Sequence, residues 1–212
     1  MSLRIPGGSV ELEAVLREPE SERLRGAVVL CHPHPSYGGT MDNRVVFRSA
    51  KAALAAGWAA LRFNFRGVGA STGSYDNGEG EKDDVRSAID YLAGKYPELP
   101  LALIGFSFGA RVGLPVGVAD PRIVALVGLG LPMKLHDFEF LVSNTKPSLF
   151  IAGTLDEYCP ADQLEQLGRR LPPTSTVRTI EGADHFFANA LDPLHSYISR
   201  FLLQLKTGRS GA

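Results

Sequence analysis

The chain alternates between short apolar runs and longer stretches in which apolar residues recur at helical spacing. Most of the short runs are rich in valine, leucine and alanine, a pattern typical of strands buried on both faces of a parallel sheet. They predict strands at residues 27–31, 58–65, 101–106, 123–129 and 148–151, with a more polar strand at 176–180. The amphipathic stretches predict helices between Asn43 and Gly57, at 81–96, from 108 onward, at 164–171 and at 192–205.

Capping residues define the ends of the first helix. Asp42 or Asn43 can accept hydrogen bonds from the N–H groups of its first turn, and Gly57 stands where a left-handed residue closes a helix. The apolar side of this helix is expected to consist of Val46, Phe47, Ala50, Ala53 and Leu54. The next helix begins with acidic residues, which favour the positive end of its dipole: Glu81, Asp83 and Asp84.

Further local signals lie at the two ends of the chain and near its middle. Leu3–Ile5 and Val10–Leu16 flank a Pro-Gly-Gly-Ser turn, which predicts an antiparallel hairpin. Asp192 is expected to cap the last helix, with Pro193 in its first turn. Pro115 is expected to end or kink the helix in which it stands.

Strands that alternate with helices at this spacing predict an α/β fold, with a mostly parallel sheet covered by helices on both faces. The 212 residues fit a single domain over residues 1–205, followed by a flexible C-terminal tail at 206–212. Ligands of such sheets bind at the carboxyl ends of the strands. We therefore expect chemically active side chains just after strands.

The charge balance changes this picture little. There are 22 lysines and arginines against 23 acidic residues, so bulk charge indicates neither a nucleic-acid partner nor a membrane surface. No apolar run reaches the ~20 residues that span a bilayer. No signal peptide is visible at the start, and the two cysteines fit a reducing compartment, which together predict a cytoplasmic protein. The oligomeric state is not predicted.

The pattern Gly-x-Ser-x-Gly occurs twice, around Ser107 and around Ser71. Only Ser107 follows an apolar strand and precedes a helical stretch, which is the context of a nucleophile elbow. In such a turn the serine hydroxyl stands above the sheet edge, and the flanking glycines avoid clashes. Ser107 is therefore the predicted nucleophile, and Ser71 is interpreted as a turn residue in a glycine-rich loop.

A serine needs a neighbouring base, and the base needs a carboxylate. His185 follows the last strand and is the candidate base, whereas His195 falls within the final helix and His136 follows no strand. Asp156 follows the strand that begins at Ser148 and is the candidate acid.

Two other carboxylates are rivals for the role of Asp156. Asp184 adjoins the histidine in sequence, and sequence neighbours in a turn rarely face each other. Glu157 would need a shifted loop. Both carboxylates stay open as alternatives. With Asp156 as the acid, the three catalytic candidates follow the order serine, aspartate, histidine along the chain.

Acyl transfer also needs two donors directed at the developing oxyanion. The backbone N–H of Phe108 is one candidate, and the loop after residues 27–31 is expected to supply the other. Pro33 and Pro35 lack an N–H, so His34 is the candidate second donor. The His-x-His spacing of His32 and His34 also fits metal ligands, but no obvious third or fourth ligand follows. We expect no metal and no cofactor, and a buried His32 bonded to backbone.

Five segments together resemble the α/β-hydrolase superfamily, and within it the small lidless bacterial serine hydrolases. They are His32-Pro-His-Pro with Gly38-Gly-Thr-Met, Leu61-Arg-Phe-Asn-Phe-Arg-Gly-Val-Gly-Ala-Ser, Gly105-Phe-Ser-Phe-Gly-Ala, Gly153-Thr-Leu-Asp and Gly182-Ala-Asp-His-Phe-Phe. The likeness runs from about Ala27 to Leu205. It implies the same roles for Ser107, His185 and Asp156, with His34 and Phe108 as oxyanion donors, and a structural loop around Ser71. Many relatives have His-Gly where this chain has His32-Pro33.

Relatives with a cap domain insert many tens of residues where this chain has only Gly130–Pro147. The resemblance therefore implies no cap and an open site. Its floor is expected to include Phe106, Phe108, Tyr37, Leu131, Met133 and Phe186.

These features together predict a serine hydrolase, most simply a carboxylesterase that acts on small acyl esters through an acyl-enzyme. A thioesterase or a peptidase would use the same three side chains. The alternative hypothesis, of a different functional class, is a binding or scaffold protein that has the hydrolase fold but catalyses no reaction.

Overall fold

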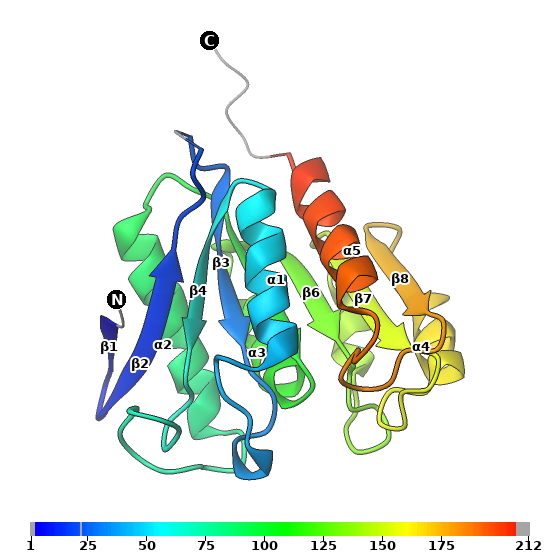
Figure 1. Cartoon of the computed structure of the whole chain (residues 1–212), viewed down its shortest axis with the longest axis horizontal. Helices are drawn as coiled ribbons and strands as arrows, with labels where there is room; N and C mark the ends of the chain where they lie inside the picture. Colours follow the sequence, from blue (N-terminus) through cyan, green and yellow to red (C-terminus); the bar gives the residue numbers. More distant parts are fainter. Residues whose placement is uncertain (1–2, 22, 207–212) are drawn as a thin grey trace.

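The computed structural model describes residues 3–21 and 23–206. Its described residues form an eight-stranded sheet in the order β1-β2-β4-β3-β5-β6-β7-β8 (Figure 1). The strands are β1 (Leu3–Gly7), β2 (Val10–Arg17), β3 (Gly26–Cys31), β4 (Trp58–Phe63), β5 (Leu101–Phe106), β6 (Ile123–Leu129), β7 (Ser148–Gly153) and β8 (Ser175–Ile180). β1 and β2 form the predicted hairpin and join the sheet antiparallel, and the six strands from β4 to β8 in the sheet order are parallel.

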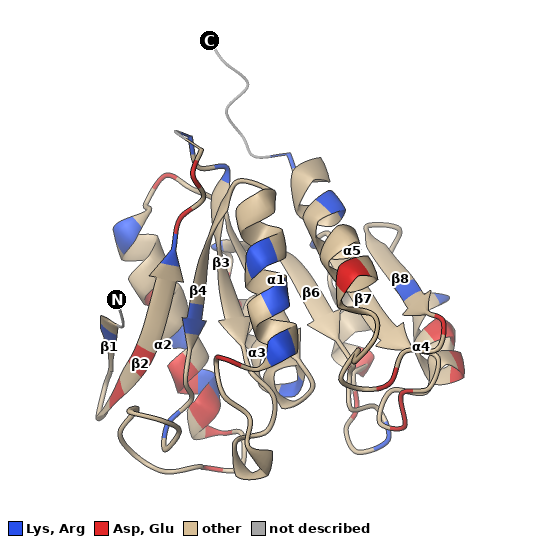
Figure 2. Ribbon diagram, in the orientation of Figure 1, with Lys and Arg blue, Asp and Glu red and all other residues tan. Residues whose placement is uncertain are grey.

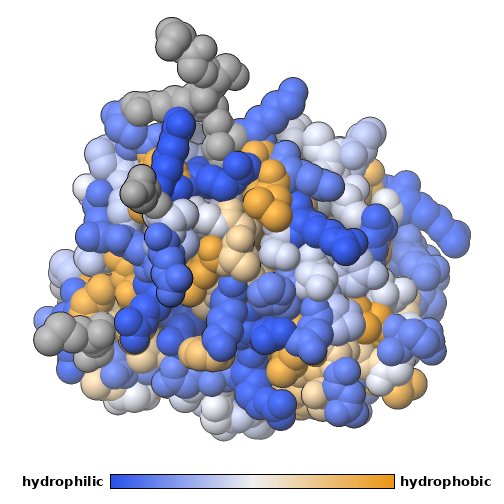
Figure 3. Space-filling model, turned by 45° about the horizontal axis from the view of Figure 1, so that its top comes forward, coloured by the Kyte–Doolittle hydropathy of each residue, from blue (hydrophilic) through white to orange (hydrophobic). Residues whose placement is uncertain are grey.

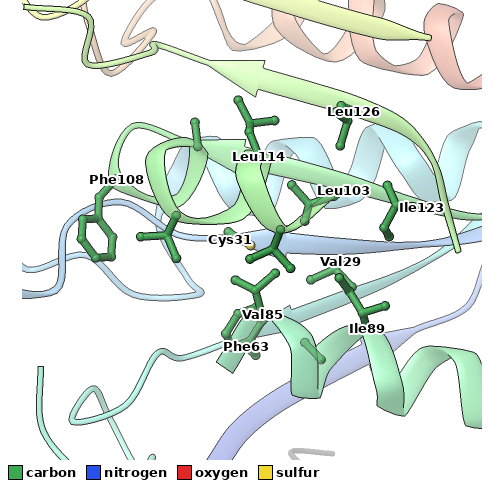
Figure 4. Close-up of a cluster of buried hydrophobic side chains, with 14 of the residues drawn as sticks. Val29, Cys31, Phe63, Val85, Ile89, Leu103, Phe108, Leu114, Ile123 and Leu126 are labelled. Atoms are coloured by element: carbon green, nitrogen blue, oxygen red, sulfur yellow. The ribbon is translucent and has the colours of Figure 1, made fainter. Parts of the chain in front are cut away.

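Helices cover both faces of the sheet, as predicted. The helices α1 (Arg44–Ala55) and α5 (Leu191–Gln204) lie together on one face, and α2 (Gly80–Lys95), α3 (Phe108–Ala119) and α4 (Ala161–Gly168) cover the other (Figure 1). Two apolar cores result, one on each face. Figure 4 shows part of the core between the sheet and the helices α2 and α3, where Cys31 lies among side chains from β3, β5, α2 and α3. On the face of the molecule seen in Figure 3, hydrophilic side chains dominate and hydrophobic ones are scattered.

The order of the strands places a crevice above β3 and β5. From β3 the chain turns to β4 on one side, and it later returns to β5 on the other side of β3. The connections therefore leave the carboxyl ends of β3 and β5 in opposite directions, which opens a space at this edge. The loop that follows Cys31 and the turn that contains Ser107 both start there.

The ends of α1 agree with the sequence prediction, and so does its predicted apolar side except at Phe47. Asn43 caps the helix by accepting a hydrogen bond from the N–H of Val45 at 2.9 Å, and Gly57 adopts a left-handed conformation. Phe47 is 44% exposed. It lies under the cations of Lys51 and Arg62, 5.2 and 5.0 Å from its ring centre, which satisfies the aromatic face outside the core. Figure 2 shows the basic positions along this side of α1.

The structure also corrects the predicted cap of the last helix and excludes a helix end at Pro115. Asp192 does not cap α5: the residue before the helix is Ala190, and Asp192 stands in the first turn, where it pairs with Arg48. Pro115 does not end α3, which continues to Ala119. A proline in a helix removes one hydrogen bond, and the tight packing of α3 against β5 compensates for this loss. The predicted tail at 206–212 lies outside the described residues except for Lys206.

The acidic start of α2 does more than match the helix dipole (Figure 2). The Asp84 carboxylate is fully buried and accepts hydrogen bonds from the backbone N–H and the guanidinium of Arg66, at 2.9 and 2.8 Å. Burial raises the pKa of the Asp84 carboxyl, and the bonds from Arg66 act in the opposite direction. The Glu81 carboxylate accepts from the N–H groups of Asp76 and Gly78, each at 2.8 Å. These two carboxylates therefore hold both ends of the loop between β4 and α2.

His32 ties the end of β3 to the end of β4. Its Nε2 accepts a hydrogen bond from the N–H of Phe65 at 3.0 Å, so its Nδ1 carries the proton that faces the carbonyl oxygen of Pro33 at 2.6 Å. The ring is fully buried, as predicted. Burial lowers the pKa of His32 to about 4, although the bond to Pro33 acts in the opposite direction.

Replacement of Asp84 by alanine is expected to lower the free energy of unfolding by about 3 kcal/mol, because Arg66 loses its buried partner. Asp83→Ala is the matched control, since Asp83 is adjacent, exposed and paired only with Arg86; its cost should stay below about 1 kcal/mol. Urea unfolding followed by circular dichroism measures both. Equal losses in the two variants would contradict the proposed anchoring by Asp84.

His32 is expected to stay neutral as the pH falls from 6.5 to about 4. In this window the unfolded chain binds a proton at this histidine that the folded chain does not bind. The free energy of unfolding should therefore fall by up to about 3 kcal/mol through this one group. NMR titration of the His32 ring protons gives the midpoint directly, with a short peptide spanning residues 30–34 as the unfolded reference. A folded midpoint equal to that of the peptide would refute the expectation.

Candidate active site

The turn between β5 and α3 holds Ser107 in a conformation that few side chains adopt. Ser107 has φ 54° and ψ −117°, which costs about 1–3 kcal/mol of backbone strain. A Cβ at Gly105 would lie 2.6 Å from the Cα of Ala110, so only glycine lets the helix start so close to the strand. The backbone N–H of Ser107 donates a hydrogen bond to the carbonyl oxygen of Leu129, at the end of the neighbouring strand β6, at 2.9 Å. The serine hydroxyl therefore stands at the carboxyl edge of the sheet.

His185 and Asp156 reach the serine from two other loops at the same edge. His185 Nε2 lies 2.9 Å from Ser107 Oγ, and His185 Nδ1 lies 2.9 Å from both carboxylate oxygens of Asp156. Both side chains are almost fully buried. The three groups form one hydrogen-bonded chain from carboxylate to hydroxyl.

The Asp156 carboxylate is fixed by its own loop. Its Oδ1 accepts hydrogen bonds from the backbone N–H groups of Tyr158 and Cys159, each at 2.9 Å. A Cβ at Gly130 would lie 3.1 Å from the imidazole of His185 and 3.2 Å from Asp156, so the absence of a side chain there leaves room for the pair. The carboxylate keeps its second oxygen for the histidine.

The two rival carboxylates lie elsewhere. Asp184 accepts a hydrogen bond from the N–H of Ala188 at 2.9 Å and so closes its own turn. Glu157 is exposed to solvent. Neither carboxylate forms a hydrogen bond or an ion pair with His185 within the described part of the chain. Ser71, in the second Gly-x-Ser-x-Gly pattern, binds backbone groups: its hydroxyl donates to the carbonyl of Asn64 and accepts from the N–H of Glu13.

Aromatic rings surround the imidazole of His185. The ring centres of Tyr158, Phe106 and Phe186 lie 4.7, 5.3 and 5.3 Å from that of His185. These contacts limit rotation of the imidazole and keep Nε2 directed at Ser107. No sequence pattern indicated Tyr158 for this role, because its position depends on how the loop after β7 folds.

The loop after β3 closes tightly onto the start of α3. A Cβ at Gly109 would lie 2.3 Å from the carbonyl oxygen of Cys31, and one at Gly39 would lie 2.1 Å from that of Pro33. The rings of His34 and Phe108 are 4.8 Å apart. The backbone N–H groups of these two residues donate to no acceptor within the described residues. Both candidate donors are thus available beside Ser107.

A cavity of about 180 Å³ opens beside Ser107 and His185. Its wall includes the buried ring of Phe108 and, exposed at the mouth, the side chains of Tyr37, Leu135, Tyr158 and Phe186. Tyr37 and Phe186 were predicted to line the site. No cap covers it, since the chain between β6 and β7 contains only a short 3₁₀ turn at Glu139–Ser143.

Three predicted pocket residues do not line the cavity. Phe106 and Leu131 are buried in the cores on either face of the sheet, and Met133 faces a separate surface hollow. Residues within or directly after an apolar strand point alternately to either face, so the sequence did not show which of these would face the cavity.

The sequence analysis missed polar residues of the cavity wall, among them Arg111 and His136. Arg111 lies in the first turn of α3, directly after the turn that holds Ser107, and this nearness to the nucleophile along the chain is the signal that could have found it. His136 carries no comparable signal, because it lies in the irregular chain after β6.

Arg111 sets the electrostatic character of this wall. Burial lowers the pKa of His34 and of His136, and the charge of Arg111 lowers both further. Burial raises the pKa of the Tyr75 hydroxyl, which lies 3.2 Å from Nε2 of His34. At neutral pH these residues are therefore uncharged, and Arg111 supplies the positive charge.

The described residues contain no group of three or more histidine, cysteine, aspartate or glutamate side chains suited to a metal ion. Within the same residues no helix is long and apolar enough to cross a bilayer.

Comparisons with known proteins agree with this architecture. The family described as "Alpha/beta hydrolase domain" matches residues 25–192. An uncharacterized protein of Rickettsia prowazekii, RP471, is 35% identical over 190 residues, which cover 85% of this chain and 79% of that protein.

Two solved structures are similar over nearly the whole chain. An alpha-beta serine hydrolase homologue from Coxiella burnetii has a TM-score of 0.88 and 33% identity, covering 94% of this chain and 96% of its own. XC6422 from Xanthomonas campestris, described as an a/b serine hydrolase without lid, has a TM-score of 0.87 and 30% identity, covering 95% and 93%. The chain belongs to the α/β-hydrolase family, and its fold is that of the small members without a lid.

Proposed function

We propose that this protein is a serine esterase that cleaves small carboxylic esters with Ser107 as nucleophile, His185 as base and Asp156 as the supporting acid. The observation that carries the proposal is the continuous hydrogen-bonded chain from Asp156 through His185 to Ser107. Family membership supports hydrolytic chemistry. The choice of esters rests on the open, uncapped cavity beside the serine.

In the first half of the reaction, Ser107 Oγ attacks the ester carbonyl while His185 Nε2 takes its proton. The carbonyl π electrons move to oxygen, and the N–H groups of His34 and Phe108 hold this oxyanion. Asp156 stabilises the imidazolium through Nδ1–H. When the tetrahedral intermediate collapses, the C–O bond to the alcohol breaks, and His185 returns the proton to the departing alkoxide. The acyl group remains on Ser107.

In the second half, water takes the place of the alcohol. His185 Nε2 removes a proton from water as it attacks the acyl-enzyme, and the same two N–H groups hold the second oxyanion. Collapse breaks the bond to Ser107 Oγ, which recovers its proton from His185. The products are the carboxylic acid and the free enzyme, so one water is consumed for each ester cleaved.

The size and the rim of the cavity favour short acyl groups. An apolar cavity of about 150 Å³ holds benzene, and the cavity here is about 180 Å³. At the mouth of this cavity, the side chains of Tyr37, Leu135 and Phe186 have exposed fractions of 87, 64 and 55%. They offer an apolar surface to a larger leaving group without enclosing it.

A fluorophosphonate probe is expected to label Ser107 covalently, because an activated serine attacks the phosphorus, displaces fluoride and is phosphonylated. Ser107→Ala should abolish labelling and lower kcat on 4-nitrophenyl acetate by about 10⁶-fold. Intact-mass spectrometry and peptide mapping locate the label.

Ser71→Ala is the matched control for this experiment, since Ser71 lies in the same Gly-x-Ser-x-Gly pattern but binds backbone groups. It should retain the label on Ser107. A folded wild-type protein that takes up no probe would refute the esterase and favour a binding or scaffold role.

A series of 4-nitrophenyl esters is expected to give the highest kcat/KM with short acyl chains, because longer ones must leave the cavity. Initial rates at 405 nm, with the Ser107→Ala protein as the blank, measure the series. Activity confined to acyl chains of eight carbons or more would contradict the small cavity as the acyl site.

A further inference from the structure

Arg111 brings a positive charge to the wall of the cavity that contains Ser107. Among the described residues that line this cavity it is the only arginine or lysine, and no aspartate or glutamate lines it. Its backbone N–H donates to the carbonyl of Ser107 at 3.1 Å. Arg111 lies in the first turn of α3, directly after the turn that holds Ser107, and both residues line the cavity, so the guanidinium and the nucleophile border the same space.

No carboxylate within the described residues forms an ion pair with Arg111. Its guanidinium donates to the carbonyl oxygen of Asn77 at 3.1 Å and lies over the Phe108 ring, 5.8 Å from its centre. The guanidinium also forms a hydrogen bond with the Tyr75 hydroxyl. All three partners are uncharged. They orient the planar group while leaving its charge without a counter-ion.

Two carboxylates lie near enough to interact with Arg111 or its neighbours through space, and both have other partners. Glu79 binds Lys82 Nζ at 2.8 Å, and Glu81 accepts from the backbone N–H groups of Asp76 and Gly78. Neither lines the cavity. The charge of Arg111 is therefore directed toward a space that holds no protein anion.

The remaining wall of the cavity divides into a polar and an apolar part. His34 and His136 lie on it with Arg111, and the positive charge of Arg111 disfavours protonation of both rings. Leu135 and Phe186 supply apolar surface. An occupant that satisfies all of these groups combines an anionic group with an apolar one.

We propose that Arg111 binds an anionic group of the substrate, a carboxylate or its equivalent, while Ser107 attacks an ester carbonyl of the same molecule. This inference rests on the esterase function proposed above and narrows its substrates to esters that carry a second, negatively charged group. The guanidinium fork matches a carboxylate with two parallel hydrogen bonds.

Two matched pairs of esters test this inference and locate the anion. Mono-4-nitrophenyl adipate and 4-nitrophenyl hexanoate differ by a carboxylate on the acyl side. 4-Acetoxybenzoate and 4-acetoxybenzamide differ by a carboxylate on the alcohol side. The readout is the ratio of kcat/KM for the anionic ester to that for the neutral ester. At least one pair is expected to give a ratio of about ten to a hundred, the usual range for hydrogen bonds to a charged group.

The variant Arg111→Gln should lower that ratio about tenfold or more, and Arg111→Lys should restore part of it because the charge remains. Arg86→Gln is the control: it removes one arginine charge outside the cavity and should leave the ratio unchanged. Added salt should also lower the ratio, because the cavity is open and its charges are screened.

Two results would overturn the inference while the esterase stands: wild-type ratios near one for both pairs, or equal losses on both members of a pair in Arg111→Gln. The second result would assign Arg111 a purely structural role through Asn77. If no ester is cleaved and Ser107 takes up no probe, the esterase fails instead. Calorimetric titration of 4-acetoxybenzoate into the Ser107→Ala protein then decides anion binding alone: binding that Arg111→Gln removes supports the inference, and its absence overturns it.

Discussion

The close approach of three chain segments around Ser107 is the constraint on which the site depends. The start of α3 comes so near to β5 and to the end of β3 that a Cβ at Gly105 or Gly109 would overlap backbone atoms at 2.6 or 2.3 Å. This contact forces the strained turn of Ser107 and brings the loop of His34 beside Phe108. The strain of about 1–3 kcal/mol is offset because all three segments belong to buried strands and helices. One packing constraint therefore places the nucleophile and both proposed oxyanion donors at the same edge of the sheet.

The surrounding loops reach this edge through buried polar contacts rather than through apolar packing. His32 joins the ends of β3 and β4, while Asp84 and Glu81 hold the loop before α2. That loop in turn offers the carbonyl of Asn77 to Arg111. His32, Asp84 and Glu81 are buried and bonded, so a shift of either loop would leave an unpaired polar group at a cost of about 1–3 kcal/mol. These contacts hold the loops that form part of the cavity wall.

The sequence predicted what depends on local pattern and left open what depends on loop geometry. Apolar periodicity was sufficient to locate the parallel strands and the α-helices, but not the two 3₁₀ helices, at Pro35–Tyr37 and Glu139–Ser143. The position after a strand was sufficient to select Ser107, Asp156 and His185, which the structure brings together. Asp192 was misread because an acidic residue fits a cap and a first helical turn equally well, and only the contact with Arg48 separates them. Phe106 and Leu131 were placed in the pocket because burial in a core and exposure to a cavity both require apolar side chains. Their direction depends on the fold.

An uncapped site changes how such an enzyme can select its substrate. A lid excludes water and so strengthens every polar contact inside, whereas here Tyr37 and Phe186 stand in solvent and charges at the mouth are screened. Selection must then come from groups that are already fixed before the substrate binds, because no closing movement assembles them. Arg111 meets this condition, since its guanidinium is oriented by the Asn77 carbonyl and the Phe108 ring. The same openness limits the effect of its charge, so such a site favours anionic esters by a graded preference and does not exclude neutral ones.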